Sequence, residues 1–238
     1  MDTLAASRAI VRQRIEALRA ALLTQGLDAW LQPSADPHVS EYLPERWQGR
    51  QWLSGFTGSV GLLIVTAEFA GLWVDSRYWV QAETQLAGTG IDVMKVGSAG
   101  SAAYMDWLAE HVATGGAVGV DGAVLGLAQA QALQEKLESR DIRLVTDRDL
   151  LGHVWTERPP LPAAAVFEHA PPFALVPRRE KLATVHDAMR RHGADWHLVC
   201  TLDDIAWITN LRGADVPYNP VFVAHLLVGM QSATLFVA

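Results

Sequence analysis

The sequence has a single cysteine, no excess of basic residues and no long hydrophobic run. With Cys200 alone, the chain cannot form an internal disulfide, which fits a reducing, cytoplasmic compartment. The net charge of −7 argues against nucleic acid or an anionic membrane surface as a partner. No apolar run approaches the roughly 18 residues of a membrane-spanning helix, and the charged amphipathic start of the chain is not a signal peptide.

Motifs of common catalytic sites are also missing. The sequence contains no HExxH, no CxxC, no helix with metal ligands at three- or four-residue spacing and no visible Ser-His-Asp arrangement. The glycine-rich stretch Gly55–Gly61 precedes a predicted strand, so it lacks the helix N-terminus that phosphate-binding loops use. We therefore expect neither a metal site nor a catalytic residue in this segment.

Hydrophobic periodicity predicts the elements at the start of the chain. Apolar residues at 11, 15, 18 and 22 mark one face of a helix, and Gly26 is expected to end it. A strand is expected to begin at Ala29–Leu31. The two apolar runs Leu62–Val65 and Leu72–Val74, separated by a short break, predict a β-hairpin.

The same order of elements recurs later in the chain. A second helical face at 182, 185 and 189 ends at Gly193 and is followed by the apolar run Trp196–Cys200, at an offset of 167 residues from the first copy. The motif led by Trp52 recurs at Trp207 with an offset of 155 residues. We interpret this as one unit used twice: helix, strand, polar loop, Trp-led turn and hairpin.

These patterns predict an α/β protein made of two related domains with mixed sheets flanked by helices. Strands are expected at 117–120 and 143–146, and helices at 101–112 and 125–139. The predicted bounds are 1–157 for the first domain, 158–177 for a proline-rich linker and 178–238 for the start of the second. Because the residues that follow the first hairpin have no counterpart after the second, the second domain is expected to be incomplete and the chain to be a fragment.

Tryptophan is abundant, with nine residues in the chain. Trp52, Trp73, Trp79 and Trp207 have apolar neighbours and are expected in the core. Trp47 stands between polar residues in a loop and is expected at a surface or interface.

The exit of the predicted hairpin carries the sequence Asp75-Ser76-Arg77-Tyr78. Paired charges at a strand end are common at ligand contacts. One interpretation of Arg77 is a structural ion pair with Asp75 or Glu83. The other is a guanidinium offered to a carboxylate or carbonyl of a ligand.

Two further groups of polar residues leave alternatives open. Asp36, His38 and Glu41 could form a cluster for a hard metal ion, or a polar loop that hydrogen-bonds to itself. The adjacent carboxylates of Asp203 and Asp204 could bind a cation, but helix capping is the better interpretation because carboxylates favour a helix N-terminus.

Five segments in order resemble one known family. They are PSxDxHxSEY at 33–42, SGFxGSxG at 54–61, LWxDxRYxxQAxxQ at 72–85, LDDIAW at 202–207, and NLRGxDV followed by NPVF at 210–222. Together they resemble the first two domains of cytosolic-type Xaa-Pro aminopeptidases. The resemblance covers nearly the whole chain.

The resemblance implies creatinase-like N-terminal domains with a ribonuclease-H-like fold. It implies that a third domain, absent here, removes an N-terminal residue preceding proline with two divalent metal ions, usually manganese. It implies short peptides with proline in second position as substrates and allows a homodimer of the full-length protein. Arg77 is the implied substrate-binding residue, with Asp36, His38, Glu41 and Asp75 as secondary candidates. The resemblance implies that this segment forms part of the wall of the active site and contributes no catalytic residue to the reaction.

Two rival interpretations remain at this point. Creatinase- and prolidase-like hydrolases share the first-domain fold, but they usually lack the second related domain. A non-enzymatic interaction module is the other rival, since some histone-chaperone subunits carry an inactive aminopeptidase-like region.

Overall fold

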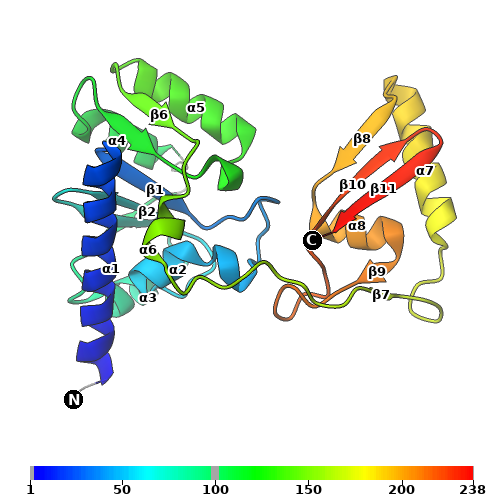
Figure 1. Ribbon diagram of the computed structural model, residues 1–238, viewed down its shortest axis with the longest axis horizontal. Coiled ribbons are helices and arrows are strands. Elements are labelled where there is room, and N and C mark those ends of the chain that lie inside the picture. The colour runs from blue at the N-terminus through cyan, green and yellow to red at the C-terminus, as the bar shows by residue number, and fades with distance from the viewer. Residues whose placement is uncertain (1–2, 98–101, 238) are drawn as a thin grey trace. The chain divides into compact units, whose positions relative to one another are not determined.

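The computed structural model describes residues 3–97 and 102–237. The chain divides into two compact units (Figure 1). The first unit consists of residues 1–37 and 47–158, and the second of residues 38–46 and 159–238. No helix in the described ranges is long and apolar enough to cross a membrane.

The first unit is built on a mixed six-stranded sheet in the order β4-β3-β2-β1-β5-β6. The predicted hairpin is confirmed, because β2 and β3 pair antiparallel, and β1 pairs antiparallel with β2. The outer strands β4, β5 and β6 pair parallel to their neighbours. The strands are β1 (Ala29–Pro33), β2 (Leu62–Thr66), β3 (Ala70–Val74), β4 (Asp92–Lys95), β5 (Ala117–Gly119) and β6 (Arg143–Val145).

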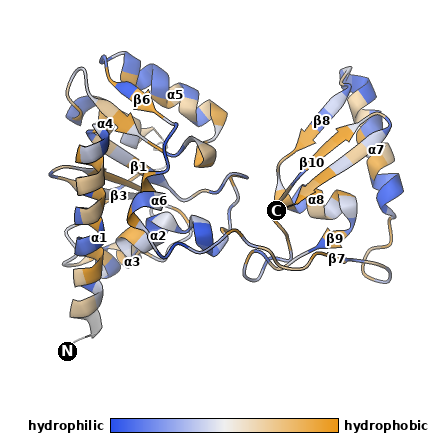
Figure 2. Ribbon diagram, viewed as in Figure 1, coloured by the Kyte–Doolittle hydropathy of each residue, from blue (hydrophilic) through white to orange (hydrophobic). Residues whose placement is uncertain are grey.

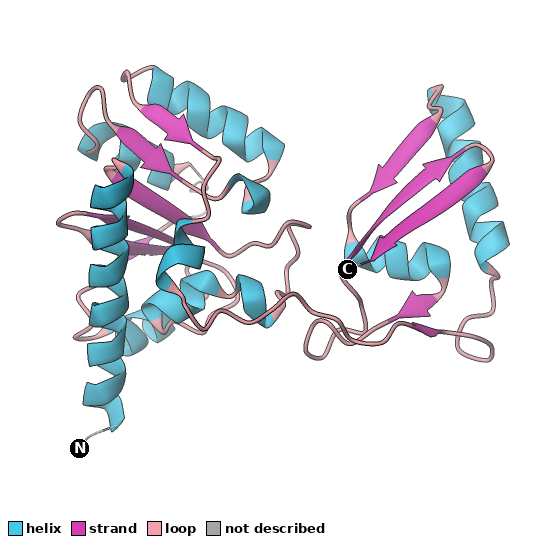
Figure 3. Cartoon of the chain, viewed as in Figure 1, coloured by secondary structure: helices cyan, strands magenta, loops and turns pink. Residues whose placement is uncertain are grey.

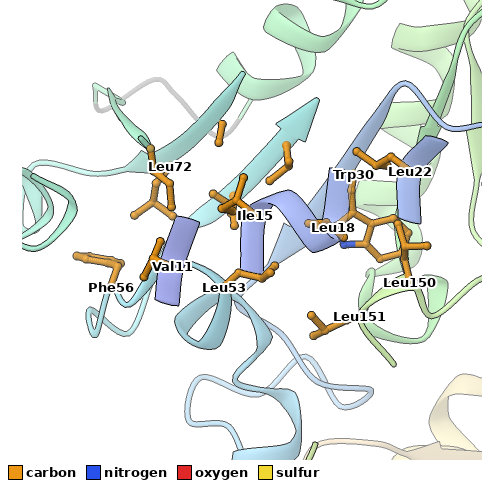
Figure 4. Packing of buried hydrophobic residues seen from close by; sticks show 14 of the residues in the cluster. Val11, Ile15, Leu18, Leu22, Trp30, Leu53, Phe56, Leu72, Leu150 and Leu151 are labelled. Atoms are coloured by element: carbon orange, nitrogen blue, oxygen red, sulfur yellow. The ribbon is translucent and has the colours of Figure 1, made fainter. Parts of the chain in front are cut away.

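The predicted first helix is confirmed as α1 (Thr3–Gln25). It ends at Gly26, whose φ of +63° is a left-handed conformation that glycine adopts without steric cost. The four residues of its predicted apolar face are buried in one cluster with Trp30 and Leu53, seen in Figure 4. Apolar spacing therefore determined both the helix and its buried side.

Helices cover both faces of this sheet (Figure 3). Buried residues of α1, α2 (Gly49–Ser54), α3 (Trp79–Leu86) and α6 (Leu150–Val154) form the cluster on one face. Residues of α4 (Ala103–His111) and α5 (Leu127–Glu138) form the cluster on the other. Part of the helix predicted at 101–112 falls on residue 101, which lies outside the described residues.

The second unit has a smaller antiparallel sheet in the order β11-β10-β8. Its central strand β10 is the most buried of the three, and Figure 2 shows hydrophobic residues along it. A separate two-stranded sheet pairs β7 with β9. The elements are β7 (Phe167–Glu168), α7 (Arg178–His192), β8 (Trp196–Val199), α8 (Leu202–Thr209), β9 (Leu211–Arg212), β10 (Ala224–Gly229) and β11 (Ser232–Val237).

The two units repeat one arrangement, as the sequence predicts. The order α1-β1-α2-β2-β3 corresponds to α7-β8-α8-β10-β11, and in both units the strands pair antiparallel in sequence order. The ends of the helices also correspond. Gly26 and Gly193 end the first helix of each unit, and Gly55 and Asn210 end the second, all with positive φ.

In each unit a basic side chain binds a carbonyl near the C-terminal end of the second helix. Arg14 Nη1 donates to the carbonyl of Trp52 at 2.6 Å, and its Cζ lies 4.4 Å from that indole ring. Lys181 Nζ donates to the carbonyl of Trp207 at 2.7 Å and also lies 4.4 Å from the ring. Carbonyls at a helix C-terminus lack partners within the helix, so a cation is favourable there. The repeat thus extends to side-chain contacts.

The proline-rich segment 158–177 makes defined contacts within the second unit. The main-chain N–H of Ala164 donates to Asp215 Oδ1 at 3.0 Å, and Asn210 Nδ2 donates to the carbonyl of Val176 at 2.9 Å. Strand β7 lies inside this segment and pairs with β9. The domain bounds 1–157, 158–177 and 178–238 stay a prediction.

Two expectations for tryptophan were wrong. Trp47 is buried, with 8% exposure, in a 3₁₀ turn (Glu45–Trp47), so its expected place at a surface is wrong, while the alternative of an interface stays a prediction. Trp207 is 51% exposed although its neighbours are apolar. It lies on α8 on the opposite side from the buried Ile205 and Ile208, because a helix turns about 100° per residue. The sequence predicts turns at Trp52 and Trp207. In the structure these two residues lie in the short helices α2 and α8.

Candidate substrate-binding site

The exit of β3 forms a tight turn that presents Arg77. The main-chain N–H of Tyr78 donates to the carbonyl of Asp75 at 3.0 Å, and α3 begins at the next residue. Arg77 Nε and Nη2 donate to the two carboxylate oxygens of Asp75 at 3.0 and 2.8 Å. The main-chain N–H of Arg77 adds a third bond to Oδ1 at 3.0 Å. The two parallel hydrogen bonds from the guanidinium to the carboxylate fix the orientation of the Arg77 side chain.

The Arg77–Asp75 ion pair lies at the surface. The Arg77 side chain is 67% exposed and that of Asp75 is 35% exposed. The hydrogen bonds from Arg77 hold the pKa of the Asp75 carboxyl below its usual value, so the carboxylate is ionised at neutral pH. Exposed pairs contribute about 0–1 kcal/mol to stability. The pair is therefore better suited to orienting the arginine than to holding the fold.

The alternative partner of Arg77, Glu83, is engaged elsewhere. Its carboxylate pairs with Lys95 Nζ at 2.6 Å. The structure thus resolves which acid pairs with Arg77. The guanidinium also lies near an aromatic ring, with Arg77 Cζ 5.4 Å from the centroid of Tyr78.

The glycine-rich loop Gly55–Gly61 is tied to the same turn. Ser59 Oγ and the Tyr78 hydroxyl are 2.8 Å apart, and the main-chain N–H of Thr57 donates to Gln85 Oε1 on α3 at 3.0 Å. The loop follows the C-terminus of α2 and leads into β2. The loop thus contacts the turn through Tyr78 and α3 through Gln85.

Buried Arg50 on α2 holds this loop through hydrogen bonds to its carbonyl groups. It donates to the carbonyl of Phe56 at 2.9 Å, to that of Gly58, and to Ser34 Oγ at 2.6 Å. Ser34 Oγ donates in turn to the carbonyl of Gly61 at 2.8 Å. Burial lowers the pKa of Arg50 to about 10, so the guanidinium stays charged at neutral pH.

Sequence reasoning missed Arg50. The signal was its position, three residues before Leu53 and four before Ser54, which places all three on one helix face. Through Arg50, three of the segments that carry the family resemblance meet in one hydrogen-bonded network: Ser34, the glycine-rich loop and the DSRY turn.

The remaining candidates divide between the two units. Asp36 belongs to the first unit and is fully buried. His38 and Glu41 belong to the second. His38 Nδ1 lies 2.8 Å from the carbonyl of Cys200, and its ring centroid is 4.5 Å from that of His225. Burial and the neighbouring His38 lower the pKa of His225.

Glu41 is exposed at the edge of a small cavity in the second unit. The cavity has a volume of about 160 Å³ and is lined by Ser40, Glu41, Tyr42, Leu202, Asp203, Asn219 and Val221. Asp203 and Asp204 both lie in the first turn of α8, where carboxylates favour the helix dipole. Three of the resemblance segments thus border one cavity.

The described residues offer no site for a metal cluster. Nowhere in 3–97 or 102–237 do three or more His, Cys, Asp or Glu side chains gather in a way that could hold a metal ion. Asp36 lies in the first unit and His38 and Glu41 in the second, so the choice between a hard-metal cluster and a polar loop that hydrogen-bonds to itself stays a prediction.

The chain matches known proteins along nearly its whole length. Two models described as "Creatinase/Prolidase N-terminal domain" match residues 14–148 and 157–238. Xaa-Pro aminopeptidase 2 of Sus scrofa is 37% identical over 94% of this chain and 33% of its own length. Aminopeptidase P2 of Arabidopsis thaliana is 34% identical over 98% of this chain and 33% of its own length.

A solved structure gives the same result. The X-prolyl aminopeptidase of Caenorhabditis elegans, described as a cytosolic enzyme with a di-nuclear active site, superimposes with a TM-score of 0.88 at 28% identity. The superposition covers 96% of this chain and 39% of that one. The chain spans about a third of the length of the curated relatives it matches. It therefore belongs to the creatinase/prolidase N-terminal domain family, and its two domains match those of Xaa-Pro aminopeptidases.

Proposed function

We propose that the chain is the N-terminal, non-catalytic portion of a Xaa-Pro aminopeptidase, an enzyme that removes an N-terminal residue preceding proline. The observation that carries the proposal is the match of both units, in order, to the corresponding part of such enzymes over more than nine-tenths of the chain. Its role is to wall the active-site entrance and to help bind short peptides with proline in second position.

The catalytic chemistry is assigned to another part of the longer protein. The C. elegans relative has a di-nuclear active site, whereas the described residues here do not fit a metal cluster. Two divalent ions, manganese in this proposal, would activate the water that attacks the peptide bond. We also propose a cytoplasmic location, supported by the single cysteine and the cytosolic relative, and a homodimer of the full-length protein.

Within this segment, Arg77 is the residue proposed to contact the peptide. Three hydrogen bonds to Asp75 hold it in one orientation, and two-thirds of its side chain is exposed. A guanidinium suits a peptide carbonyl or carboxylate because its donors are planar and paired. Asp75 acts as its positioning residue, and Asp36, His38 and Glu41 stay secondary candidates.

We expect Arg77→Ala in the full-length enzyme to lower kcat/KM by ten- to a hundredfold, which corresponds to about 1.4–2.8 kcal/mol. The melting temperature should hardly change, because an exposed ion pair contributes little to stability. Steady-state kinetics on an X-Pro-containing peptide and thermal denaturation measure the two effects.

The matched control is Lys95→Ala, which removes the comparably exposed Lys95–Glu83 ion pair. It should leave both kinetics and stability near the wild type. A stability loss above about 2 kcal/mol in Arg77→Ala with unchanged kinetics would instead support a purely structural ion pair.

The purified 238-residue chain should not cleave an X-Pro bond above background, even with saturating manganese. The reaction needs a nucleophile activated at a metal site, and the described residues offer no ligand set for one. Peptidase assays test turnover, and calorimetry tests stoichiometric manganese binding. Metal-dependent turnover by this chain would refute its assignment as non-catalytic.

A further inference from the structure

The second unit contains a larger cavity than the one beside Glu41. It has a volume of about 470 Å³ and is lined by residues 159–164, Ala214, Asp215, Pro217, Glu45 and Arg46. All of these residues belong to the second unit. The volume lies in the range of about 300–1,000 Å³ that is usual for small-molecule sites. We call this cavity the proline pocket, because four of its lining residues are prolines.

Hydrogen bonds fix the wall formed by residues 159–164 at both ends. At one end Arg46 Nη1 donates to the carbonyl of Pro159 at 2.8 Å. At the other end the main-chain N–H of Ala164 donates to Asp215 Oδ1 at 3.0 Å. Asp215 therefore ties this wall to the loop that precedes β10. A wall held in this way is ordered before a ligand arrives, which lowers the entropy cost of binding.

This wall offers acceptors and apolar surface but few donors. Three of its six residues are prolines, which have no main-chain N–H. The N–H of Ala164 is already bonded to Asp215. The proline rings and the side chains of Leu161 and Ala163 supply apolar surface. The complementary ligand therefore carries N–H donors together with an apolar side chain.

Charges of opposite sign stand next to each other at the pocket. Glu45 and Arg46 are neighbours in the 3₁₀ turn Glu45–Trp47, and both line the pocket. A carboxylate attracts an ammonium group, and a guanidinium attracts a carboxylate. A ligand that carries both groups, such as a short peptide with free ends, fits this pair of charges better than a simple anion or cation does.

An exposed aromatic residue lies beside the pocket. The main-chain N–H of Asn219 donates to the carbonyl of Val216 at 3.2 Å, and this bond closes a turn whose second residue, Pro217, lines the pocket. The third residue is Tyr218, which is fully exposed and has a φ of +63°. Glycine or asparagine is usual at such a position, because other residues are strained there. A strained tyrosine that packs against nothing favours a role in binding.

We propose that the proline pocket binds a short apolar peptide with free ends. Its ammonium group lies at Glu45 and the carbonyl oxygens of the wall, its carboxylate faces Arg46, and its side chains pack on the proline rings. Tyr218 covers the bound peptide. The groups involved belong to the second unit, whereas Arg77 belongs to the first. The inference needs no peptidase activity, because the ligand class follows from the groups of the pocket itself.

Titration of the 238-residue chain with the dipeptide alanyl-leucine, followed by two-dimensional NMR, tests the proposal. We expect a Kd of about 1 mM or below for a ligand of this size, with amide shifts concentrated at Ala163, Ala164 and Ala214. Acetylation of the amino group or amidation of the carboxylate should each weaken binding about fivefold or more. Shifts confined to the turn at Arg77 would support the role proposed for Arg77 and overturn this inference.

A substitution with a matched control links binding to the pocket. Glu45→Gln should weaken binding of the free dipeptide about fivefold or more and leave binding of the acetylated form unchanged, because only the ammonium group meets Glu45. The control is Glu180→Gln, at an exposed glutamate of the same unit that does not line the pocket. It should change the affinity for neither form.

Tyr218→Gly separates binding from stability. It should weaken binding of the dipeptide, while the melting temperature stays the same or rises, because glycine adopts a positive φ without strain. The absence of binding up to about 10 mM dipeptide would overturn the proposal. Affinities in Glu45→Gln and Tyr218→Gly that equal that of the unsubstituted chain would overturn it as well.

Discussion

Replacing Leu18 with alanine should lower the free energy of unfolding of the first unit by about 2–5 kcal/mol. Leu18 is 0% exposed and lies at the centre of the cluster between α1 and the sheet, beside Trp30 and Leu150 (Figure 4). The substitution loses the transfer energy of the removed carbons and leaves a cavity that the close-packed neighbours fill only partly. Urea denaturation followed by circular dichroism measures the loss.

The matched control is Leu23→Ala on the same helix. Leu23 is 85% exposed, so its truncation removes little buried surface and should change stability by less than about 0.5 kcal/mol. Equal losses from both substitutions would mean that helix propensity, and not packing of the predicted apolar face, determines the contribution of α1.

The second large effect is expected for Arg50→Ala, with a loss of about 3 kcal/mol. Arg50 is 5% exposed and donates to two loop carbonyls and to Ser34 Oγ. Its removal leaves the carbonyls of Phe56 and Gly58 buried without their donors, and an unsatisfied buried acceptor costs about 1–3 kcal/mol. Faster amide exchange in Gly55–Gly61 should accompany the loss, measured alongside urea denaturation.

Arg12→Ala provides the control for charge and side-chain length. Arg12 is exposed and makes a single hydrogen bond to the carbonyl of Gly88 at 2.5 Å. Its loss should stay below about 1 kcal/mol because surface interactions of this kind compete with water. If Arg50→Ala cost no more than Arg12→Ala, the buried network would not be what holds the loop.

Arg50 matters beyond stability because of what the loop touches. Ser59 of the loop contacts the hydroxyl of Tyr78, the residue after Arg77. A loosened loop would remove a support of the turn that orients Arg77, so the role proposed for Arg77 predicts that Arg50→Ala also weakens peptide binding in the full-length protein. A positioned site needs support from residues that do not themselves contact the ligand.

Local patterns in the sequence determined the elements of the repeat. The spacing of Val11, Ile15, Leu18 and Leu22 defines both α1 and its buried face, because a helix of 3.6 residues per turn places them on one stripe. Gly26 and Gly193 end their helices because a left-handed residue costs glycine nothing. The β2–β3 hairpin followed from two short apolar runs and a break. These features depend on neighbours a few residues away.

The tertiary structure alone decided features that depend on residues far apart in sequence. Glu83 on α3 pairs with Lys95 on β4, a partner that the packing of the helix against the strand brings within reach. Trp52 stacks on Trp155, a residue far away in the sequence. Arg50 is buried because carbonyls of a loop satisfy its donors, and polar sequence neighbours could not reveal those partners. The burial of a side chain and the identity of its partners depend on the tertiary packing. Local periodicity in the sequence does not tell which distant residue will contact a given side chain.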